Sequence, residues 1–402
     1  MRRRRFLEAA SGASLVGLAG CLVQDEGSTA TDTTNSETTT DDSTTSDGET
    51  RTTSDSTTSD DETQTSEPAG LSGTITVATY ESFLNAPSKS YDAPGAFVKE
   101  RFEEAHPDAT IEYTVPKNGL NGYIQRRKKG ASVDADVYVG LNIDDLVRID
   151  ENLEDTRLFR ELDTSRMDHA DRVREDLDFG DPKGRALAYD TGYISLVFDE
   201  RDVDAPETLD ELTTEEYRGK LLAQNAQGTD TGQAFLLWTI AQKGPDDYLD
   251  YWERLLDNDV KILGSWWDSY SAYLDDQRPM VVSYSTDQVF ANRDGQNMAK
   301  HQVGFPNDQG FANPEGMGVI TGTEEADLAY EFMDFVLRGD VQETIALANV
   351  QFPAVTDKHV DLPAEFSDYA YRPNEPVALG YDELKGNLST WIEDWSRLVA
   401  SN

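Results

Sequence analysis

The stretch Lys261–Phe290, KILGSWWDSYSAYLDDQRPMVVSYSTDQVF, gathers the rings of Trp266, Trp267, Tyr270, Tyr273, Tyr284 and Phe290. Aromatic residues make up only 9% of the sequence, so this concentration is local. Gly264 and Ser265 precede the tryptophans and predict a loop that enters a helix, where ligands are usually met. The apolar run Pro279–Tyr284 predicts a short buried strand followed by polar residues. In α/β sheets crevices open beyond the carboxyl ends of strands, so we predict a ring-lined pocket here.

Such a pocket suits a flat, cationic organic ligand, because the face of an aromatic ring attracts a desolvated cation. Trp266 is the first choice for a ring that stacks on the ligand and Tyr284 the second, with Tyr270 and Phe290 beside them. The alternative is that Trp266, Tyr270 and Tyr273 recur at helical spacing because they face a core, which is the commoner use of such rings.

The N-terminus predicts an export signal over residues 1–21. Arg2–Arg5 and a weakly apolar segment, Ala9–Gly20, are typical of a twin-arginine signal, and the apolar part is too short to span a bilayer stably. The segment ends in Leu-Ala-Gly-Cys, similar to the lipobox of secreted lipoproteins, and Cys21 is the only cysteine. We expect cleavage before Cys21, lipidation of its thiol and an exported protein held at the cell surface. An uncleaved signal anchor or an inert thiol is the alternative.

Residues 22–70 predict a disordered, acidic linker rich in serine and threonine, because so few large apolar side chains cannot offset the entropy of ordering. The whole chain carries 77 acidic against 35 basic residues, a formal net charge of −42. Such a charge excludes nucleic acid as a partner. A diffuse acidic excess with few lysines is typical of proteins from salt-loving archaea. At multimolar salt the Debye length is below about 3 Å, so ligand specificity must come from short-range contacts.

Beyond the linker, strand and helix patterns alternate, which predicts an α/β fold with parallel βαβ sheets. About 330 residues are enough for two lobes. We expect 71–188 together with 317–402 to form lobe 1 and 189–316 to form lobe 2. The strand patterns cover 74–79, 109–115, 135–139, 187–198 and 279–284; the helix patterns cover 95–106, 121–130, 208–212, 232–243, 246–256 and 324–338.

Several short motifs, in this order, resemble those of the thiamine-binding components of thiamine ABC importers. They span 74–395 and are Ala78–Phe83, Ala135–Leu141, Tyr189–Tyr193, Trp266–Tyr270, Ser283–Thr286, Asn349–Pro353 and Trp391–Trp395. The resemblance implies a two-lobed periplasmic-binding-protein-like fold of type II, with the ligand cleft between the lobes. It also implies that the protein captures thiamine or a thiamine phosphate and delivers it to a membrane permease and its ATPase subunit. We expect a monomeric haloarchaeal lipoprotein version of this family.

The motif after the first strand offers Tyr80 as a ring and Glu81 as an acceptor for the ligand amine; the alternative for Glu81 is a solvated loop acid. Asn142 stands where the resemblance suggests an acidic residue, so an amide oxygen replaces a charge. Asp144 or Asp145 could substitute for that charge, or could cap a helix instead.

Asp190 lies in the run expected to cross between the lobes, where its carboxylate could hold the ligand amine or organise the hinge. Thr229 opens a helix pattern and could contact the ligand, cap the helix, or do both. Phe290 stands where the resemblance suggests tyrosine, and Val350 where it suggests tryptophan, so the chain departs from the family at both positions.

We expect neither an enzyme nor a bound cofactor or metal. The single cysteine is assigned to lipid, and the sequence lacks a glycine-rich nucleotide loop and an HExxH motif. The rival hypotheses of the same fold are a ferric-iron-binding protein and a binder of polyamines or other organic cations. Ferric-iron binders of this fold use paired tyrosines with histidine or carboxylate, whereas here Tyr284 has no tyrosine beside it and the four histidines are scattered.

Overall fold

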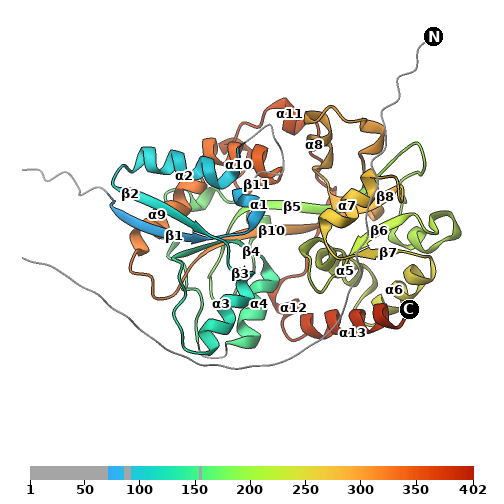
Figure 1. Ribbon diagram of the computed structural model, residues 1–402, viewed down its shortest axis with the longest axis horizontal. Coiled ribbons are helices and arrows are strands. Elements are labelled where there is room, and N and C mark those ends of the chain that lie inside the picture. The colour runs from blue at the N-terminus through green and yellow to red at the C-terminus, as the bar shows by residue number, and fades with distance from the viewer. Residues whose placement is uncertain (1–70, 86–91, 154–155) are drawn as a thin grey trace, which may run out of the picture. The chain divides into compact units, whose positions relative to one another are not determined.

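A computed structural model describes residues 71–85, 92–153 and 156–402 (Figure 1). The predicted signal over 1–21, with Cys21, and the predicted linker over 22–70 lie outside these residues. Among the described residues, no helix combines the length and the apolar character needed to cross a membrane.

One mixed sheet runs through the described chain, in the strand order β2-β1-β4-β10-β5-β8-β6-β7. These strands are β1 (Gly73–Ala78), β2 (Ala109–Thr114), β4 (Val137–Leu141), β5 (Leu187–Phe198), β6 (Leu221–Gln224), β7 (Lys261–Leu263), β8 (Met280–Tyr284) and β10 (Gln309–Val319). Short strands pair with the two central strands outside this order: β9 (Gln302–Gly304) and β11 (Phe352–Pro353) with β5, and β12 (Glu375–Val377) with β10. The two-residue β3 (Lys117–Asn118) precedes α3.

The two long strands β5 and β10 connect the lobes. They pair antiparallel from Phe311↔Ile194 to Met317↔Leu187, with a register shift between Glu315 and Gly316. The neighbours on either side form parallel pairs, β1 with β2 and β4, and β6 with β7 and β8. The prediction of parallel sheets therefore holds within each lobe and is wrong for β5 and β10, which run antiparallel to β8 and β4. Both predicted lobe boundaries fall in these two strands.

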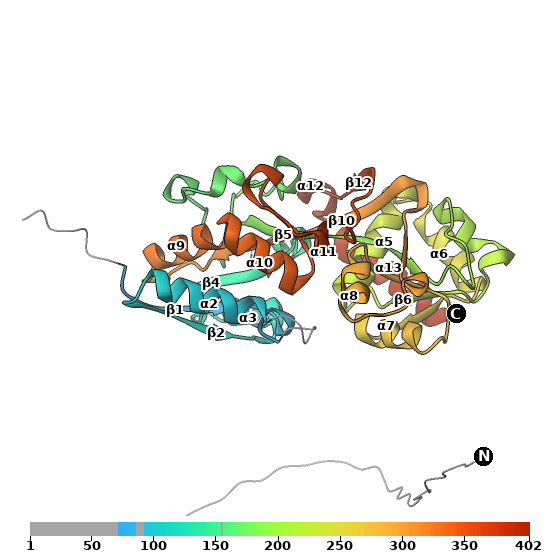
Figure 2. The ribbon, with the colours of Figure 1, turned by 90° about the horizontal axis from the view of Figure 1, so that it is seen from above.

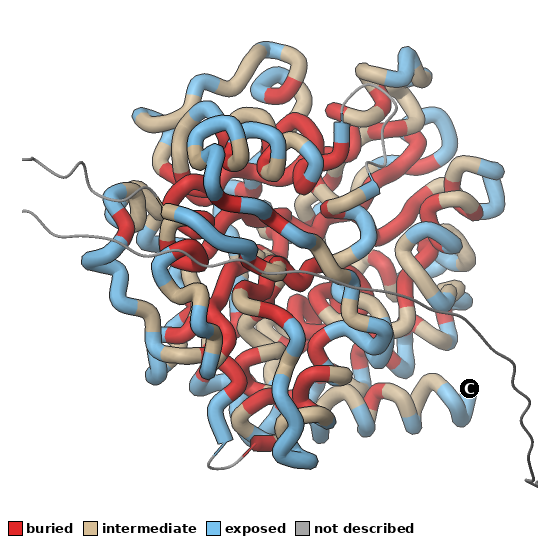
Figure 3. The backbone as a smooth tube through the Cα atoms, turned by 60° about the vertical axis from the view of Figure 1, so that its left-hand side comes forward, coloured by how far each residue is buried: buried red, intermediate tan, exposed pale blue. Residues whose placement is uncertain are grey.

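Helices cover both faces of the lobe-1 sheet. On one face α2 (Pro94–Ala105), α9 (Ala326–Val336) and α10 (Gly339–Asn349) bury a core with Ile75 and Val77 of β1. On the other face α3 (Gly119–Lys128) and α4 (Ile143–Asn152) pack on Ala78 and Tyr138. Successive strand residues point to opposite faces, which is why β1 serves both cores. The buried residues gather in the interior of the tube, and the exposed residues lie mainly along its outer turns (Figure 3).

Lobe 2 is built the same way (Figure 2). On one side lie α5 (Asp230–Lys243), α6 (Tyr248–Asp257) and α13 (Leu388–Ser401), and on the other α7 (Trp266–Leu274). Trp395 of α13 packs edge-on against Trp252 of α6, with ring centroids 5.4 Å apart. The prediction grouped the C-terminal residues with lobe 1, whereas the apolar face of α13 is buried against lobe 2. Four short helices complete the fold: α1 (Glu81–Leu84), α8 (Asp287–Arg293), α11 (Ala364–Ser367) and α12 (Tyr381–Leu384).

Candidate ligand-binding cleft

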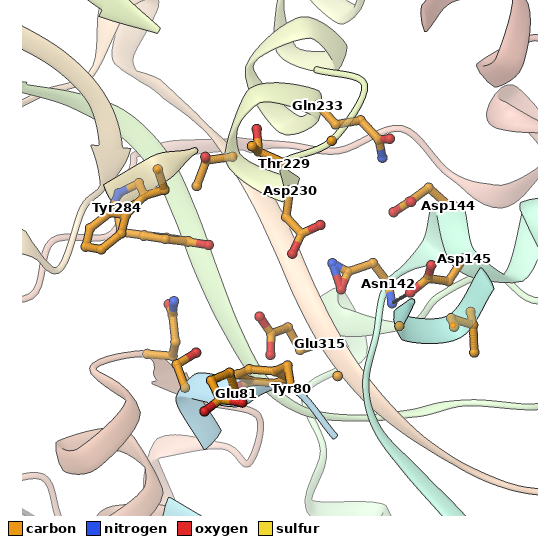
Figure 4. Close-up of a pocket in the computed structure, with 18 of the residues that line it drawn as sticks. Tyr80, Glu81, Asn142, Asp144, Asp145, Thr229, Asp230, Gln233, Tyr284 and Glu315 are labelled. Carbon is orange, nitrogen blue, oxygen red and sulfur yellow. Dashed lines mark hydrogen bonds between the residues drawn. The ribbon is translucent and has the colours of Figure 1, made fainter. Parts of the chain in front are cut away.

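A cavity of about 900 Å³ is lined by residues of both lobes. The carboxyl ends of β1, β4, β6 and β8 open onto it, through Tyr80, Asn142, Ala226 and Tyr284 respectively. Crevices at this edge of α/β sheets are the usual ligand sites, and the volume suits a small organic molecule. Figure 4 shows the polar side chains that face this space.

One wall of the cavity is aromatic. Trp266, Tyr284 and Phe290 line it, and none of the three is fully buried. The indole of Trp266 donates a hydrogen bond from Nε1 to Oγ of Ser283 across 3.1 Å. This bond joins the first turn of α7 to the end of β8 and fixes the indole plane. The predicted pocket at this strand end is therefore present, and its two first-choice rings border the cleft.

Tyr270 does not line the cavity and supports Trp266 from behind. Its ring stacks on the indole at 4.9 Å with an interplanar angle of 16°, and its hydroxyl donates to Asp287 across 2.5 Å. Residues four apart share one helix face, which places Tyr270 under Trp266. The core interpretation thus holds for Tyr270 and for the fully buried Tyr273. Trp267 is outside the cavity lining and is 62% exposed.

The opposite wall begins with Tyr80 and Glu81, at the junction of β1 and α1. The ring of Tyr80 lies against Gly140, where a Cβ would come within 2.6 Å of it. Gly140 also has a φ of +100°, so only glycine fits both the backbone and the ring. Glu81 is exposed and accepts a hydrogen bond from the side chain of Asn85. Its carboxylate lines the cavity, so both positions predicted after the first strand face the cleft.

The floor of the cleft is a chain of phenols and carboxyls. The hydroxyls of Tyr80 and Tyr189 are 2.8 Å apart, and Tyr189 donates to Oε2 of Glu315 across 2.7 Å. Burial raises the pKa of Glu315 to about 6, and the charge of Asp230 adds to this. Burial likewise raises the pKa of the Tyr80 and Tyr189 phenols well above the ordinary value. Both phenols therefore keep their protons at neutral pH.

Asp190 lies beneath this floor and does not line the cavity. It is fully buried, its Oδ2 accepts from Asn349 across 2.8 Å, and its Oδ1 has no hydrogen-bond partner. Burial and the charge of Glu315 raise the pKa of Asp190 well above the usual range. The prediction of direct amine binding is not supported by this position, whereas the alternative, a role in organising the crossover, agrees with it.

Asn142 lines the cavity at the end of β4 and opens α4. Its backbone N–H donates to the carboxylate of Asp145 across 3.2 Å. Asp145 therefore caps the start of α4, which was the alternative role predicted for it. Asp144 and Asp145 also pair with Arg148, at 2.8 Å and 3.1 Å. All four residues line the cavity.

Thr229 lines the cavity as the N-cap of α5. Its hydroxyl accepts from the N–H of Gly232 across 3.1 Å and donates to the carbonyl of Asn225 across 2.8 Å. The capping interpretation accounts for both bonds, so the hydroxyl has no second proton for a ligand. The next residue, Asp230, points into the cleft from the first turn of the helix (Figure 4).

Sequence reasoning missed Glu315, Asp230 and Asn349 as cleft residues. Val350, which follows Asn349 and also lines the cavity, has a φ of 54° in the left-handed region. A β-branched residue is rarely held there, and such strain concentrates at functional sites. The resemblance suggested a tryptophan at this position. The chain has Val350 there instead, so the site has a strained backbone and no ring.

None of the four histidines lines the cavity. His106, His169 and His301 pair with Glu331, Asp334 and Asp287, and His359 is half-buried at the end of the short 3-10 helix Asp357–His359. Among the described residues, no group of three or more histidine, cysteine, aspartate or glutamate side chains is placed to hold a metal ion.

Residues 135–376 match the model of a family described as bacterial extracellular solute-binding protein. The thiamine-binding periplasmic protein of Escherichia coli is 25% identical over 342 residues, which cover 83% of this chain and 95% of that protein. Among solved structures, a periplasmic thiamin binding protein has a TM-score of 0.67 at 22% identity over 83% of this chain and 98% of that one. A ferric binding protein from Campylobacter jejuni has a TM-score of 0.65 at 16% identity over 81% and 99%.

These two structural likenesses establish the two-lobed fold of periplasmic binding proteins. The match to the family model covers more than half of the chain, including β4, β5, β10 and most of lobe 2. The chain belongs to the family of bacterial extracellular solute-binding proteins.

Proposed function

We propose that this protein captures thiamine and delivers it to an ABC importer, acting as a binding protein and not as an enzyme. The observation that carries the proposal is the pairing of ring and charge across one cleft. Trp266 and Tyr284 line the cavity, and in Figure 4 the carboxyl groups of Glu315 and Asp230 are directed into the space beside Tyr284. Thiamine combines a permanently cationic thiazolium with an aminopyrimidine, so it needs both stacking partners and acceptors.

The rings and acids have separable roles in this proposal. The thiazolium stacks against the indole of Trp266, which Tyr270 and Ser283 hold in one orientation. Glu315 and Asp230 balance the positive charge and accept from the exocyclic amine. Because these contacts are short-range, they persist at the salt concentrations that the acidic composition indicates.

Delivery depends on closure of the lobes. β5 and β10 are the strands that join them, and the register shift between Glu315 and Gly316 provides a point of bending in β10. Closure around the ligand would expel water and present a changed surface to a permease, whose ATPase subunit drives import. Lipidation of Cys21 would hold the protein at the outer face of the membrane, with the linker as a tether.

The relative from Escherichia coli is named for thiamine binding, which supports this ligand over the alternatives. A ferric-iron site of the kind known for this fold would need tyrosinate oxygens, and burial opposes ionisation of Tyr80 and Tyr189. A visible tyrosinate–iron absorption band on adding ferric citrate would favour iron instead. A polyamine would use the same rings and acids, so competition between spermidine and thiamine distinguishes those two ligands.

Native mass spectrometry of the protein purified from its host tests the proposal directly. A retained ligand with the mass of thiamine or of one of its phosphates supports it. Titration calorimetry of the ligand-free protein with thiamine then gives the affinity. A folded protein that releases no heat with thiamine or its phosphates would rule the proposal out.

A further inference from the structure

We infer that the cleft selects the unphosphorylated, net-positive form of its ligand and rejects phosphate esters of the same molecule. This inference rests on the proposed function and narrows it to a class of ligand. The selection acts on the charge of the arm that the ligand carries beside its two rings. It follows from the charged residues that line the cavity.

Acidic side chains reach the cavity from separate elements. They are Glu81 of α1, Asp144 of α4, Asp230 of α5 and Glu315 of β10. Asp145 and Asp287 also border the cavity, but burial raises the pKa of Asp145 to about 8 and the carboxyl of Asp287 is bonded to Tyr270 and His301. Figure 4 shows Asp230 and Glu315 directed into the same space from opposite sides. A phosphate placed in this cavity would therefore meet carboxylates from more than one wall, and such like-charge contacts are a common means of rejecting a competing ligand.

The one cationic side chain in the described lining is Arg148, and it is already paired. Its Nη2 lies 2.8 Å from Asp144 and its Nη1 lies 3.1 Å from Asp145. A phosphate that approached this guanidinium would also meet the carboxylates already paired with it. The pair therefore offers no net positive charge to an anionic group.

The helix start that would usually attract a phosphate is partly capped and carries an acidic residue. The N-terminus of α5 faces the cavity, but the Thr229 hydroxyl already accepts from the Gly232 N–H. Asp230 follows in the first turn, where its negative charge takes the place that a bound anion would have.

The general acidity of the chain does not explain this arrangement. Solvent-facing acids are screened by salt, whereas groups enclosed in a cleft are screened much less. At contact distance inside the cavity, salt therefore weakens the repulsion of a phosphate less than it does on the open surface.

The test compares thiamine, thiamine monophosphate and thiamine diphosphate by titration calorimetry, in about 2 M KCl, with and without Mg²⁺. We expect thiamine to bind at least about tenfold more tightly than the monophosphate, and the diphosphate to bind more weakly still. Affinities within about twofold of one another, or a diphosphate that binds more tightly than thiamine with or without Mg²⁺, would overturn the inference and leave the proposed function standing. Absence of binding by all three would overturn the proposed function.

Asp230→Asn supplies the residue-level test, and Asp250→Asn is its control. Both residues are exposed aspartates in the first turn of a helix, but Asp250 of α6 is outside the cavity lining. D230N should lower the ratio of thiamine to monophosphate affinity by at least about threefold, while D250N leaves the ratio unchanged. Equal ratios in the two variants would show that Asp230 does not exclude phosphate.

Discussion

The amide of Asn349 donates a hydrogen bond to Oδ2 of Asp190 across 2.8 Å, joining the end of α10 to the crossover strand β5. The same amide nitrogen also donates to the hydroxyl of Tyr80 across 3.1 Å. One side chain therefore connects a helix, a crossover strand and the loop after β1. The next residue, Val350, is in the left-handed region, which valine rarely adopts. The surrounding packing must therefore hold its backbone in this conformation.

Replacing Asn349 by alanine should destabilise the protein. The change leaves the buried carboxyl of Asp190 without its remaining partner, since Oδ1 is already unpaired. We expect the free energy of unfolding to fall by about 1–3 kcal/mol, as for other buried polar groups left unsatisfied. Denaturant unfolding at fixed salt measures the change.

The control for that variant is Asn121→Ala. Asn121 also lines the cavity but is exposed on α3, so its loss should leave the free energy of unfolding nearly unchanged. Equal stabilities of N349A and N121A would show that the Asn349–Asp190 bond contributes nothing.

Trp266→Ala should weaken thiamine binding by about 2–4 kcal/mol, the range expected for a buried aromatic anchor. The neighbouring Trp267 provides a matched control, because it is on the same helix, outside the cavity lining and 62% exposed. Calorimetry in high salt should therefore show a large loss for W266A and none for W267A. Similar losses in the two variants would remove Trp266 from the site.

Cys21→Ser should release the exported protein from the membrane, because the lipid acceptor is lost. Cell fractionation of the native host, with detection in membrane and medium, measures the distribution. The wild-type chain should remain with the membrane and the variant should move to the medium. A variant that still sediments with membranes would indicate an uncleaved signal anchor in place of a lipid.

The sequence predicted the aromatic wall because its residues are close in the chain. Trp266 begins the helix and Tyr284 ends the strand of one short stretch of sequence. Local patterns were therefore enough to predict that both rings lie at the same strand end. Tyr270 was placed wrongly because being near Trp266 in sequence does not distinguish a ring beside the ligand from a ring behind it. Only the packing of α7 against β8 decides which face of the helix is covered.

The floor of the cleft could not be predicted in the same way. Nearly all of β5 is buried on both faces, so the alternation that usually separates inward from outward residues is absent around Asp190. Glu315 lies beside Pro314 and Gly316 in β10, a sequence with weak strand character, and the register shift there sets its direction. Asn349 reaches the floor only through the tertiary packing of α10.

Glu315 should make thiamine affinity and protein stability respond to pH in opposite directions. Burial raises its pKa to about 6 in the folded protein, from an ordinary value of 4.5. A cation prefers the ionised carboxylate, so thiamine should bind more tightly at about pH 7 than at about pH 5 and should release a proton on binding. In the ligand-free protein the folded state holds that proton more firmly than the unfolded state does. The contribution of Glu315 to stability is therefore present below the unfolded pKa and is lost as pH rises through about 6.

Glu315→Gln should reduce both responses, since glutamine does not titrate. Calorimetry in buffers of different ionisation enthalpy measures the proton release, and thermal unfolding at the two pH values measures the stability. The buried Asp190 titrates in the same direction and is left in the variant, so part of the stability change should remain. If the wild type and E315Q show the same proton release on binding thiamine, the carboxyl of Glu315 does not face the cation.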